Sequence, residues 1–388
     1  MKLLFYSWGA NNEATLKKNL IKEGHEIIEF SQKCENYTRD LDLAQKMIVK
    51  INETHADGVI SFNYFPIISM VCDATKTTYY SWVYDCPHFT LYAKTVNLPC
   101  NRIGIFDKAM VDALVLSGIN TVFHLPLSAD ADEFEDVIKR NRKKLASDNQ
   151  YKYDVSFVGS LYTDNHNYFD MLYQDGIPTS VSSYLEKYMG KYMLCPSYED
   201  IGEDDLVDAA VRMNELGLML GEDYECSPLD IIMPSVYEKK LTVIERDKLL
   251  HNIASNKDIS FGLYTNSKTD LPNCGTCGYS DMMPCVFNAS RINLNISLRS
   301  IHSGAPLRVI DIMASGGFVL SNYQSELAEM FAQDKEIVMF RDLGEALLKI
   351  NYYLEHEDER QRIADAGAKA VRERMGYIEG IKKILKKI

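Results

Sequence analysis

The chain has 388 residues, which is more than one ordinary hydrophobic core organises, so its length predicts two domains or one large one. A net charge of −13 disfavours nucleic acid as the main partner, because binding to a phosphate backbone needs a concentrated cationic face. No apolar run reaches the roughly 18 residues that span a bilayer, and the nine scattered cysteines favour reduced thiols. We therefore expect a cytoplasmic protein without membrane insertion.

From the N-terminus, strand-like runs of about five residues alternate with helical stretches. Such alternation predicts βαβ units and a parallel sheet, which binds ligands at the carboxyl ends of its strands. The strand-like runs lie at 2–6, 26–30, 58–62, 78–83, 102–106 and 121–125. Helices are expected at 13–23 and 40–54.

A charged segment at about 129–152 interrupts this alternation, and we place a domain boundary there. We expect a first domain over 1–150 and a second over 151–375, the second including a largely helical region at 165–255. A helical tail is expected at 342–388. Further strand-like runs lie at 154–162, 258–263, 291–297, 317–321 and 336–340.

The stretch SIHSGAPLRVIDIMASGGFVLSN, residues 300–322, predicts a helix at 306–315. Proline suits the first helical position, and the Gly316-Gly317 pair suits the stop. Arg308 and Asp311 are three apart and therefore neighbours on one face. A helix N-terminus with an arginine is a site for phosphate, and the carboxylate can accept hydrogen bonds from a ribose diol. The alternative is a plain surface ion pair followed by a glycine cap.

A longer stretch around this helix resembles a known family. The segment YSDMMPCVFNASRINLNISLRSIHSGAPLRVIDIMASGGFVLSN, together with DVSFVGSLY and the tail from 322 to about 375, resembles the CgeB-like (spore maturation) glycosyltransferases, which are related to the group-1 enzymes. The resemblance implies an α/β protein of the GT-B fold, with two Rossmann-like domains facing across a cleft. It also implies a nucleotide-sugar donor on the second domain, an acceptor on the first, and a C-terminal helix at 376–388 that crosses back to the first domain.

The resemblance also implies roles for single residues. Asp311 matches the position that holds the donor ribose, and Arg308 matches the basic position beside the diphosphate. One departure concerns Ser303, which stands where many retaining enzymes carry a first acid, so the stereochemistry stays open. The other donor-binding residues implied are Gly304, Gly316, Gly317, Arg299 and Asn295.

An inverting reaction also needs a base for the acceptor hydroxyl. Candidates in the first domain are Asp85 in WVYDCPHF, with His88 beside it, and His124 in FHLPLSAD. Each has a plainer interpretation, since Asp85 before Cys86-Pro87 is also a turn former and a histidine is often a partly buried structural residue.

The resemblance implies transfer of a hexosyl or N-acetylhexosaminyl group from a nucleotide-diphosphate sugar to a protein or glycan acceptor. Enzymes of this family commonly use a UDP-sugar, so we expect a UDP-sugar as the donor. No cofactor and no metal are expected, and Cys274-Gly275-Thr276-Cys277 is a weak signal for zinc or redox chemistry. The tyrosine-rich region 151–192 is either helix-packing core, which we favour, or an acceptor surface. Alternatives to transfer are a GT-B nucleotide-sugar epimerase and a non-catalytic module that binds a nucleotide sugar or a partner protein.

Overall fold

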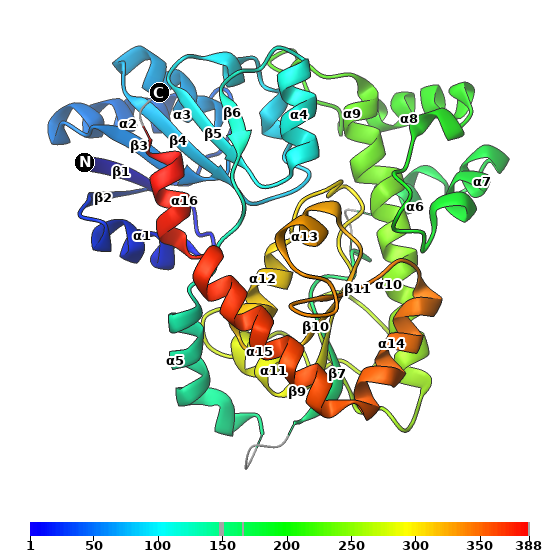
Figure 1. Cartoon of the computed structure of the whole chain (residues 1–388). Coiled ribbons are helices and arrows are strands. Elements are labelled where there is room, and N and C mark those ends of the chain that lie inside the picture. The colour runs from blue at the N-terminus through cyan, green and yellow to red at the C-terminus, as the bar shows by residue number, and fades with distance from the viewer. Residues whose placement is uncertain (147–150, 165–166, 387–388) are drawn as a thin grey trace. The chain divides into compact units, whose positions relative to one another are not determined.

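The structure, a computed structural model, describes residues 1–146, 151–164 and 167–386. The chain forms two compact units (Figure 1), and each contains one parallel sheet. The N-terminal unit comprises Met1–Ser128, Leu220–Cys226 and Met375–Ile388, and the C-terminal unit comprises Ala129–Met219 and Ser227–Arg374.

The sheet of the N-terminal unit has six strands in the order β2-β1-β3-β4-β5-β6, all parallel. Each end of its strands lies within one residue of the sequence prediction, because the apolar runs are short and bounded by polar turns. The strands are β1 (Lys2–Ser7), β2 (Glu26–Ser31), β3 (Gly58–Phe62), β4 (Thr78–Val83), β5 (Asn101–Ile105) and β6 (Val122–His124).

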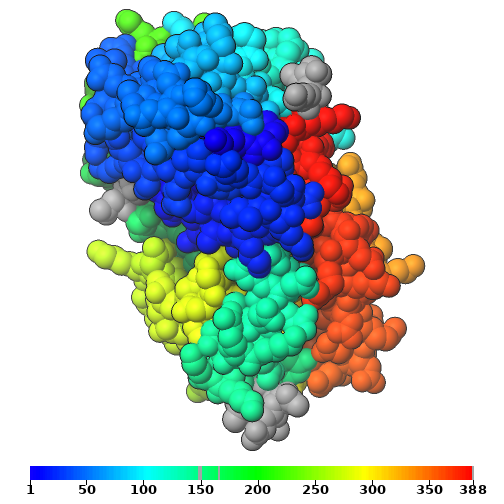
Figure 2. Space-filling view, turned by 90° about the vertical axis from the view of Figure 1, so that its left-hand side faces the viewer, coloured from blue at the N-terminus to red at the C-terminus, as the bar shows by residue number. Residues whose placement is uncertain are grey.

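Helices cover both faces of this sheet, as the central strands require because both of their faces are buried. One face packs on α2, α3 and α4, and the other packs on α1 and α16. Helix α16 comes from the far end of the sequence and packs against α1, β4 and β5. In the space-filling view it lies next to the N-terminal part of the chain (Figure 2). The helices are α1 (Glu13–Lys22), α2 (Leu41–Thr54), α3 (Pro66–Thr75), α4 (Lys108–Leu116) and α16 (Tyr377–Ile384).

The segment Leu220–Cys226 returns to the N-terminal unit from the middle of the helical region. Asp223 accepts hydrogen bonds from Arg39 Nε at 3.0 Å and Arg39 Nη2 at 3.2 Å, and from Thr38 Oγ1 at 2.8 Å. The backbone of Tyr224 pairs with Ala93 in an isolated antiparallel bridge. No sequence periodicity indicated this return.

The sheet of the C-terminal unit has five parallel strands in the order β11-β10-β9-β7-β8. One face packs on α10 and α14, and the other carries α11 and α12 with α5 and α15 outside them. The strands are β7 (Tyr153–Val158), β8 (Phe261–Tyr264), β9 (Ser290–Asn295), β10 (Val319–Asn322) and β11 (Val338–Phe340). The helices around this sheet are α5 (Ala131–Asn141), α10 (Glu238–Ser255), α11 (Met283–Asn288), α12 (Leu307–Ala314), α13 (Ser325–Met330), α14 (Leu343–Glu355) and α15 (Glu357–Arg374).

The helical region between β7 and β8 is built around buried aromatic rings. Tyr173, Tyr184 and Tyr237 are each at most 8% exposed, and the hydroxyls of Tyr173 and Tyr237 lie 2.6 Å apart. The tyrosines of this region are therefore mainly packing core, as favoured from the sequence. Its further helices are α6 (Tyr168–Leu172), α7 (Thr179–Tyr188), α8 (Glu203–Glu215) and α9 (Pro228–Ile232).

The unit boundary differs from the expected division between residues 150 and 151. The C-terminal unit begins at Ala129, because α5 packs against α11 and α15 of that unit. The charged residues there are the exposed face of an amphipathic helix, with Phe134 and Val137 buried. Residue 150 lies outside the described residues, as do residues 165 and 388 at the ends of two other expected ranges.

None of the helices within the described residues combines the length and apolar character that crossing a bilayer requires.

Candidate functional site

Helix α12 directly follows the loop at the carboxyl end of β9, which is where an open parallel sheet binds its ligands. It runs from Leu307 to Ala314, with Pro306 as its N-cap residue, so it is one residue shorter at each end than predicted. Gly316 stops it at a φ of +71°, a conformation that favours glycine.

Asp311 on α12 is buried, at 1% exposure, which excludes a plain surface ion pair. Its Oδ1 accepts a 2.8 Å hydrogen bond from the Tyr279 hydroxyl, and its Oδ2 lies 3.6 Å from Arg308 Nη1. Burial raises the pKa of Asp311 to about 6, although Arg308 and the Tyr279 hydrogen bond both act to lower it. The carboxylate is thus held ready to accept hydrogen bonds at neutral pH, with Tyr279 in place as one donor.

Arg308 has a side chain that is 30% exposed, with its guanidinium 5.5 Å from the centre of the Phe287 ring. Burial lowers the pKa of Arg246, and the positive charge of Arg308 adds to that shift.

Arg246 and Lys239, both on α10, are site residues that the sequence analysis missed. The Arg246 guanidinium lies 4.7 Å from the centre of the Tyr162 ring, and Lys239 Nζ lies 5.5 Å from the same ring. Arg246 Nε also donates to the carbonyl of Ile296, just past β9. Their spacing of seven residues puts them on one helix face, but nothing in the sequence indicated that this face meets the carboxyl edge of the sheet.

A carboxylate from α13 contacts the loop before α12. Ser303 Oγ donates a 2.7 Å hydrogen bond to Glu326 Oε1, and Glu326 is only 3% exposed. A buried acid from α13 therefore lies beside the position where the resemblance leads one to expect an acid. In the same loop Gly304 is buried, and His302 Nε2 lies 3.0 Å from Glu238 Oε1.

The remaining donor-binding candidates lie apart from Arg308 and Asp311. Arg299 is 7% exposed, and its Nη2 lies 2.6 Å from Glu245 Oε1, so its charge is compensated inside the unit. Asn295 is 5% exposed and donates to the hydroxyls of Ser297 and Ser321 between β9 and β10. Gly316 and Gly317 lie at the other end of α12, at the amino-terminal edge of the sheet. There, a side chain at Gly317 would meet Asn293 Nδ2 at 2.7 Å.

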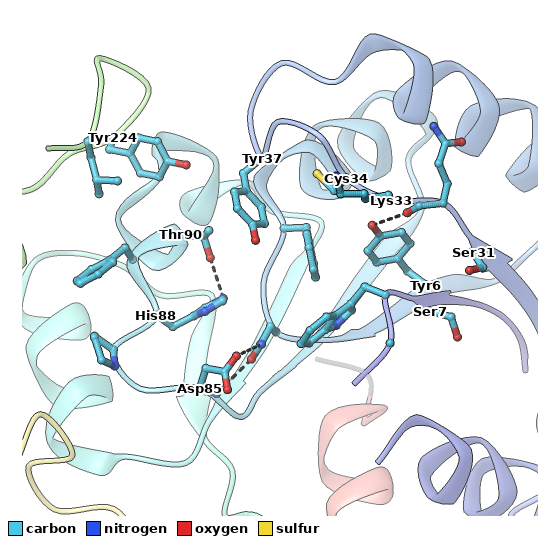
Figure 3. Close-up of a pocket in the computed structure, with 18 residues that line it drawn as sticks. Tyr6, Ser7, Ser31, Lys33, Cys34, Tyr37, Asp85, His88, Thr90 and Tyr224 are labelled. Atoms are coloured by element: carbon cyan, nitrogen blue, oxygen red, sulfur yellow. Dashed lines mark hydrogen bonds between the residues drawn. The ribbon is translucent and has the colours of Figure 1, made fainter. Parts of the chain in front are cut away.

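The N-terminal unit contains a pocket of about 780 Å³ at the carboxyl ends of β1 to β4 (Figure 3). Its wall mixes aromatic rings with polar groups, and Trp8 and Tyr37 are 40% and 50% exposed. Three backbone amides, those of Trp8, Gly9 and Ala10, donate to Glu13 Oε1 at 2.8 to 3.0 Å and fix the loop after β1. The aromatic lining residues are Tyr6, Trp8, Tyr37, Phe65, Phe89 and Tyr224.

Asp85 lies in this pocket, exposed, directly after β4. Asn63 after β3 orients it: Asn63 Nδ2 donates to Asp85 Oδ2 at 2.6 Å, and Asn63 Oδ1 accepts from the backbone amides of Tyr84 and Asp85. Asn63 adopts a φ of +59°, which asparagine tolerates better than most residues. Asp85 is therefore a held carboxylate facing open space, which is what a general base requires.

His88 and His124 differ in their relation to Asp85. His88 lines the same pocket, and its Nε2 accepts from the Tyr64 amide at 3.0 Å and lies 2.7 Å from Thr90 Oγ1. Burial lowers the pKa of His88, and Asp85 opposes this shift, so the ring is neutral at pH 7. His124 is the last residue of β6, two strands beyond β4, and its Nε2 lies 3.2 Å from the Phe106 carbonyl oxygen. The structure brings Asp85 and His88 together and leaves His124 outside the pocket.

Among the described residues, no group of three or more His, Cys, Asp or Glu side chains is arranged to hold a metal ion. Cys277, whose pKa burial raises to about 11, and the exposed Cys274 are both free thiols. Cys277 is therefore protonated at neutral pH, and Cys274 faces solvent. Among the described residues, neither thiol belongs to a group that could hold a metal ion.

Comparison with known proteins identifies the architecture. Residues 246–386, beginning at Arg246, match a protein-family model described as glycosyl transferase-like. Solved structures match along nearly the whole length of the chain. The chain has the GT-B fold. The two parallel-sheet units are the two domains of that fold. The family match begins on α10 of the second unit and ends just past α16, which belongs to the first.

Three solved structures illustrate the similarity. Anabaena HepE in complex with UDP and glucose has 11% identity and a TM-score of 0.52, over 99% of this chain and 98% of its own. Sucrose-phosphate synthase from Thermosynechococcus elongatus has 9% identity and a TM-score of 0.53, over 99% and 97%. The DNA-modifying enzyme β-glucosyltransferase, studied with and without uridine diphosphoglucose, has 12% identity and a TM-score of 0.53, over 100% of both chains. No curated protein sequence matches the chain significantly.

Proposed function

We propose that this GT-B protein is a group-1 glycosyltransferase that moves a sugar from a UDP-sugar to a glycan or protein acceptor. The single observation that carries the proposal is the buried Asp311 beside Arg308 on the helix that follows β9. The family match from Arg246 onward and the HepE structures in complex with UDP and glucose support the choice of donor. The narrower CgeB-like assignment and the identity of the sugar, hexose or N-acetylhexosamine, stay predictions.

The donor is expected to lie at the start of α12. Asp311 accepts hydrogen bonds from the ribose hydroxyls, once the Tyr279 hydroxyl has moved away. Arg308 contacts the diphosphate, and Arg246 and Lys239 add positive potential from α10. Preorganised cations of this kind stabilise the negative charge that develops on the departing UDP. We propose that this arrangement needs no metal ion.

The acceptor is expected to occupy the pocket of the N-terminal unit. Its exposed rings, Trp8 and Tyr37, offer flat apolar surfaces, and its polar groups offer hydrogen bonds, a mixture that suits a saccharide. Asp85 takes the proton from the attacking hydroxyl, and Asn63 is a positioning residue for Asp85. His88 has its Nε2 engaged by the Tyr64 amide, so its role is to support the loop.

The test is a thermal-stability series with UDP, GDP, TDP, CDP and ADP. A ligand at about one hundred times its dissociation constant adds roughly 2.7 kcal/mol, which is a shift of a few degrees. We expect UDP to stabilise the wild type, and Arg308→Ala and Asp311→Asn to lose the shift. Arg362→Ala, an exposed arginine of the same unit, is the matched control and should keep it.

Binding alone does not separate a transferase from a binding module. Release of UDP from UDP-glucose, measured with and without a panel of saccharides, makes that distinction. Transfer is supported if the wild type turns over UDP-glucose and Asp85→Asn abolishes that turnover without changing the affinity for UDP. If the wild type binds UDP but releases none from any UDP-sugar tested, the transferase proposal fails.

A further inference from the structure

A second pocket, this one in the C-terminal unit, is lined by three arginines. It lies at the edge of the sheet opposite to Arg308 and Asp311. It has a volume of about 190 Å³, roughly that of six water molecules. It opens at the amino-terminal ends of β7, β9 and β10, whereas α12 begins beyond their carboxyl ends. Arg142 after α5, Arg291 on β9 and Arg360 on α15 all line it. Helix α5, which Arg142 directly follows, and helix α15, which bears Arg360, lie side by side (Figure 2).

Two of these guanidinium groups have buried nitrogens without a hydrogen-bond partner among the described residues. They are Nε of Arg142 and Nη2 of Arg360. Arg360 is only 1% exposed, and its Nη1 donates to the Tyr353 carbonyl at 2.6 Å. A buried charged donor without an acceptor is costly, so an acceptor that is not among the described residues is expected there.

The nearby carboxylates do not supply that acceptor. Arg360 Nη2 lies 3.6 Å from Glu357 Oε1, and Arg291 Nε lies 3.5 Å from Asp154 Oδ1, both longer than a good hydrogen bond. Asp154 is also occupied, because its Oδ2 accepts from the amide and hydroxyl of Ser260 at 2.9 Å. The pocket therefore holds more positive charge than its own acids satisfy.

Other groups complete the wall of a small polar site. The Arg360 guanidinium lies 5.4 Å from the centre of the Tyr151 ring, and the Tyr151 hydroxyl donates to Gln361 Oε1 at 2.9 Å. Gln361 also lines the pocket, as does Gly316 at the end of α12. Stacking on Tyr151 holds the planar guanidinium in place, and a fixed guanidinium fork suits two oxygens of one phosphate.

We propose that this arginine pocket binds a small phosphate-bearing anion, either inorganic phosphate or the phosphate of a phosphorylated sugar. The site is separate from the donor site of the proposed function and does not depend on it. Its size admits the phosphate group and a few waters, so the phosphate is the part that the arginines recognise.

The test is isothermal titration with inorganic phosphate and, in a second arm, with glucose 6-phosphate, at 150 mM NaCl. The protein carries Arg308→Ala, so that the donor site does not contribute. We expect saturable binding, with Arg142→Gln weakening it about tenfold or more, as loss of a hydrogen bond to a charged group implies. Tighter binding of glucose 6-phosphate than of phosphate identifies a phosphorylated sugar as the source, and the reverse identifies the free ion.

The variants are chosen so that misfolding does not mimic loss of binding. Arg142 is half-buried in a short turn after α5, so Arg142→Gln is expected to fold, and far-UV circular dichroism checks this. Lys144→Gln changes an exposed cation of the same turn and should leave the affinity unchanged. Absence of saturable binding to both probes, or an equal loss in Lys144→Gln, overturns the proposal.

Discussion

The Tyr279 hydroxyl donates a 2.8 Å hydrogen bond to Asp311 Oδ1, the carboxylate that the resemblance assigns to the donor ribose. Under the proposed function, this phenol takes a place on the carboxylate that a ribose hydroxyl would otherwise take. We propose that binding of a nucleoside diphosphate exchanges this hydrogen bond for one from the ribose.

Tyr279→Phe should therefore tighten the binding of UDP. The variant removes the competing donor, and a single hydrogen bond is worth about 0.5 to 1.5 kcal/mol, or roughly two- to tenfold in affinity. Isothermal titration with UDP measures the change. Tyr352→Phe, which removes a tyrosine hydroxyl that donates to Glu359 on the surface, should have no effect. Weaker binding in Tyr279→Phe would mean that the phenol contacts the nucleotide instead of competing with it.

The buried Asp311 should make stability depend on pH in the acid range. Its pKa in the folded chain is about 6, above the roughly 3.9 of an exposed aspartate, so the folded state binds more protons between these values. The contribution of Asp311 to the free energy of unfolding should therefore fall by up to about 3 kcal/mol as the pH rises from 4 to 6, and stay level above.

Asp311→Asn isolates this contribution. Its amide oxygen can still accept from Tyr279, but it has no charge to desolvate. Urea denaturation followed by far-UV circular dichroism at steps between pH 4 and pH 7.5 should show a smaller fall in the variant than in the wild type. Equal slopes in both proteins would place the titration on another group.

Asp85→Asn should reduce turnover by about 10²- to 10⁴-fold if Asp85 is the base, while the affinity for UDP stays unchanged. Asp112→Asn changes an exposed carboxylate of the same unit and serves as the control. Steady-state release of UDP gives kcat, and titration gives the affinity. A parallel loss of UDP binding in Asp85→Asn would assign the residue to the donor instead.

Arg299→Met should destabilise the C-terminal unit by about 3 to 5 kcal/mol, because it leaves the fully buried Glu245 without its partner. The double variant with Glu245→Leu removes both charges and should recover most of that loss. Urea denaturation measures both effects. If the stable double variant has also lost UDP binding, Arg299 has a donor role in addition to its structural one.

Gly380→Ala should destabilise the N-terminal unit. Alanine in a helix normally gains about 1 kcal/mol over glycine, but here a Cβ would overlap the ring of Trp82, and overpacking costs about 1 to 3 kcal/mol. Both tryptophans, Trp8 and Trp82, lie in the N-terminal unit, so fluorescence during urea denaturation reports on that unit. Gly376→Ala is the control, since a Cβ there meets nothing within 4 Å and φ is −73°.

The sequence by itself determined the elements and their class. The runs 58–62 and 78–83 became β3 and β4 without a change of bounds, because period and turn residues are local properties. The sequence also predicts a helix at 306–315, which is α12 (Leu307–Ala314) in the structure, its glycine stop, and the placement of Asp85 after a strand. The charged segment at about 129–152 predicts a domain boundary because polar residues dominate its composition, but it contains α5, whose apolar face is buried.

Only the tertiary structure decided which of these residues meet. Strand order puts β4 beside β3 and β6 two places away, so Asn63 reaches Asp85 whereas His124 does not. Glu326 reaches Ser303 from 23 positions along the chain, and Arg246 reaches the same edge from α10. Burial converts Arg299 from a candidate ligand contact into half of an internal ion pair. Such contacts depend on how distant elements pack, and a local pattern of residue types carries no information about that packing.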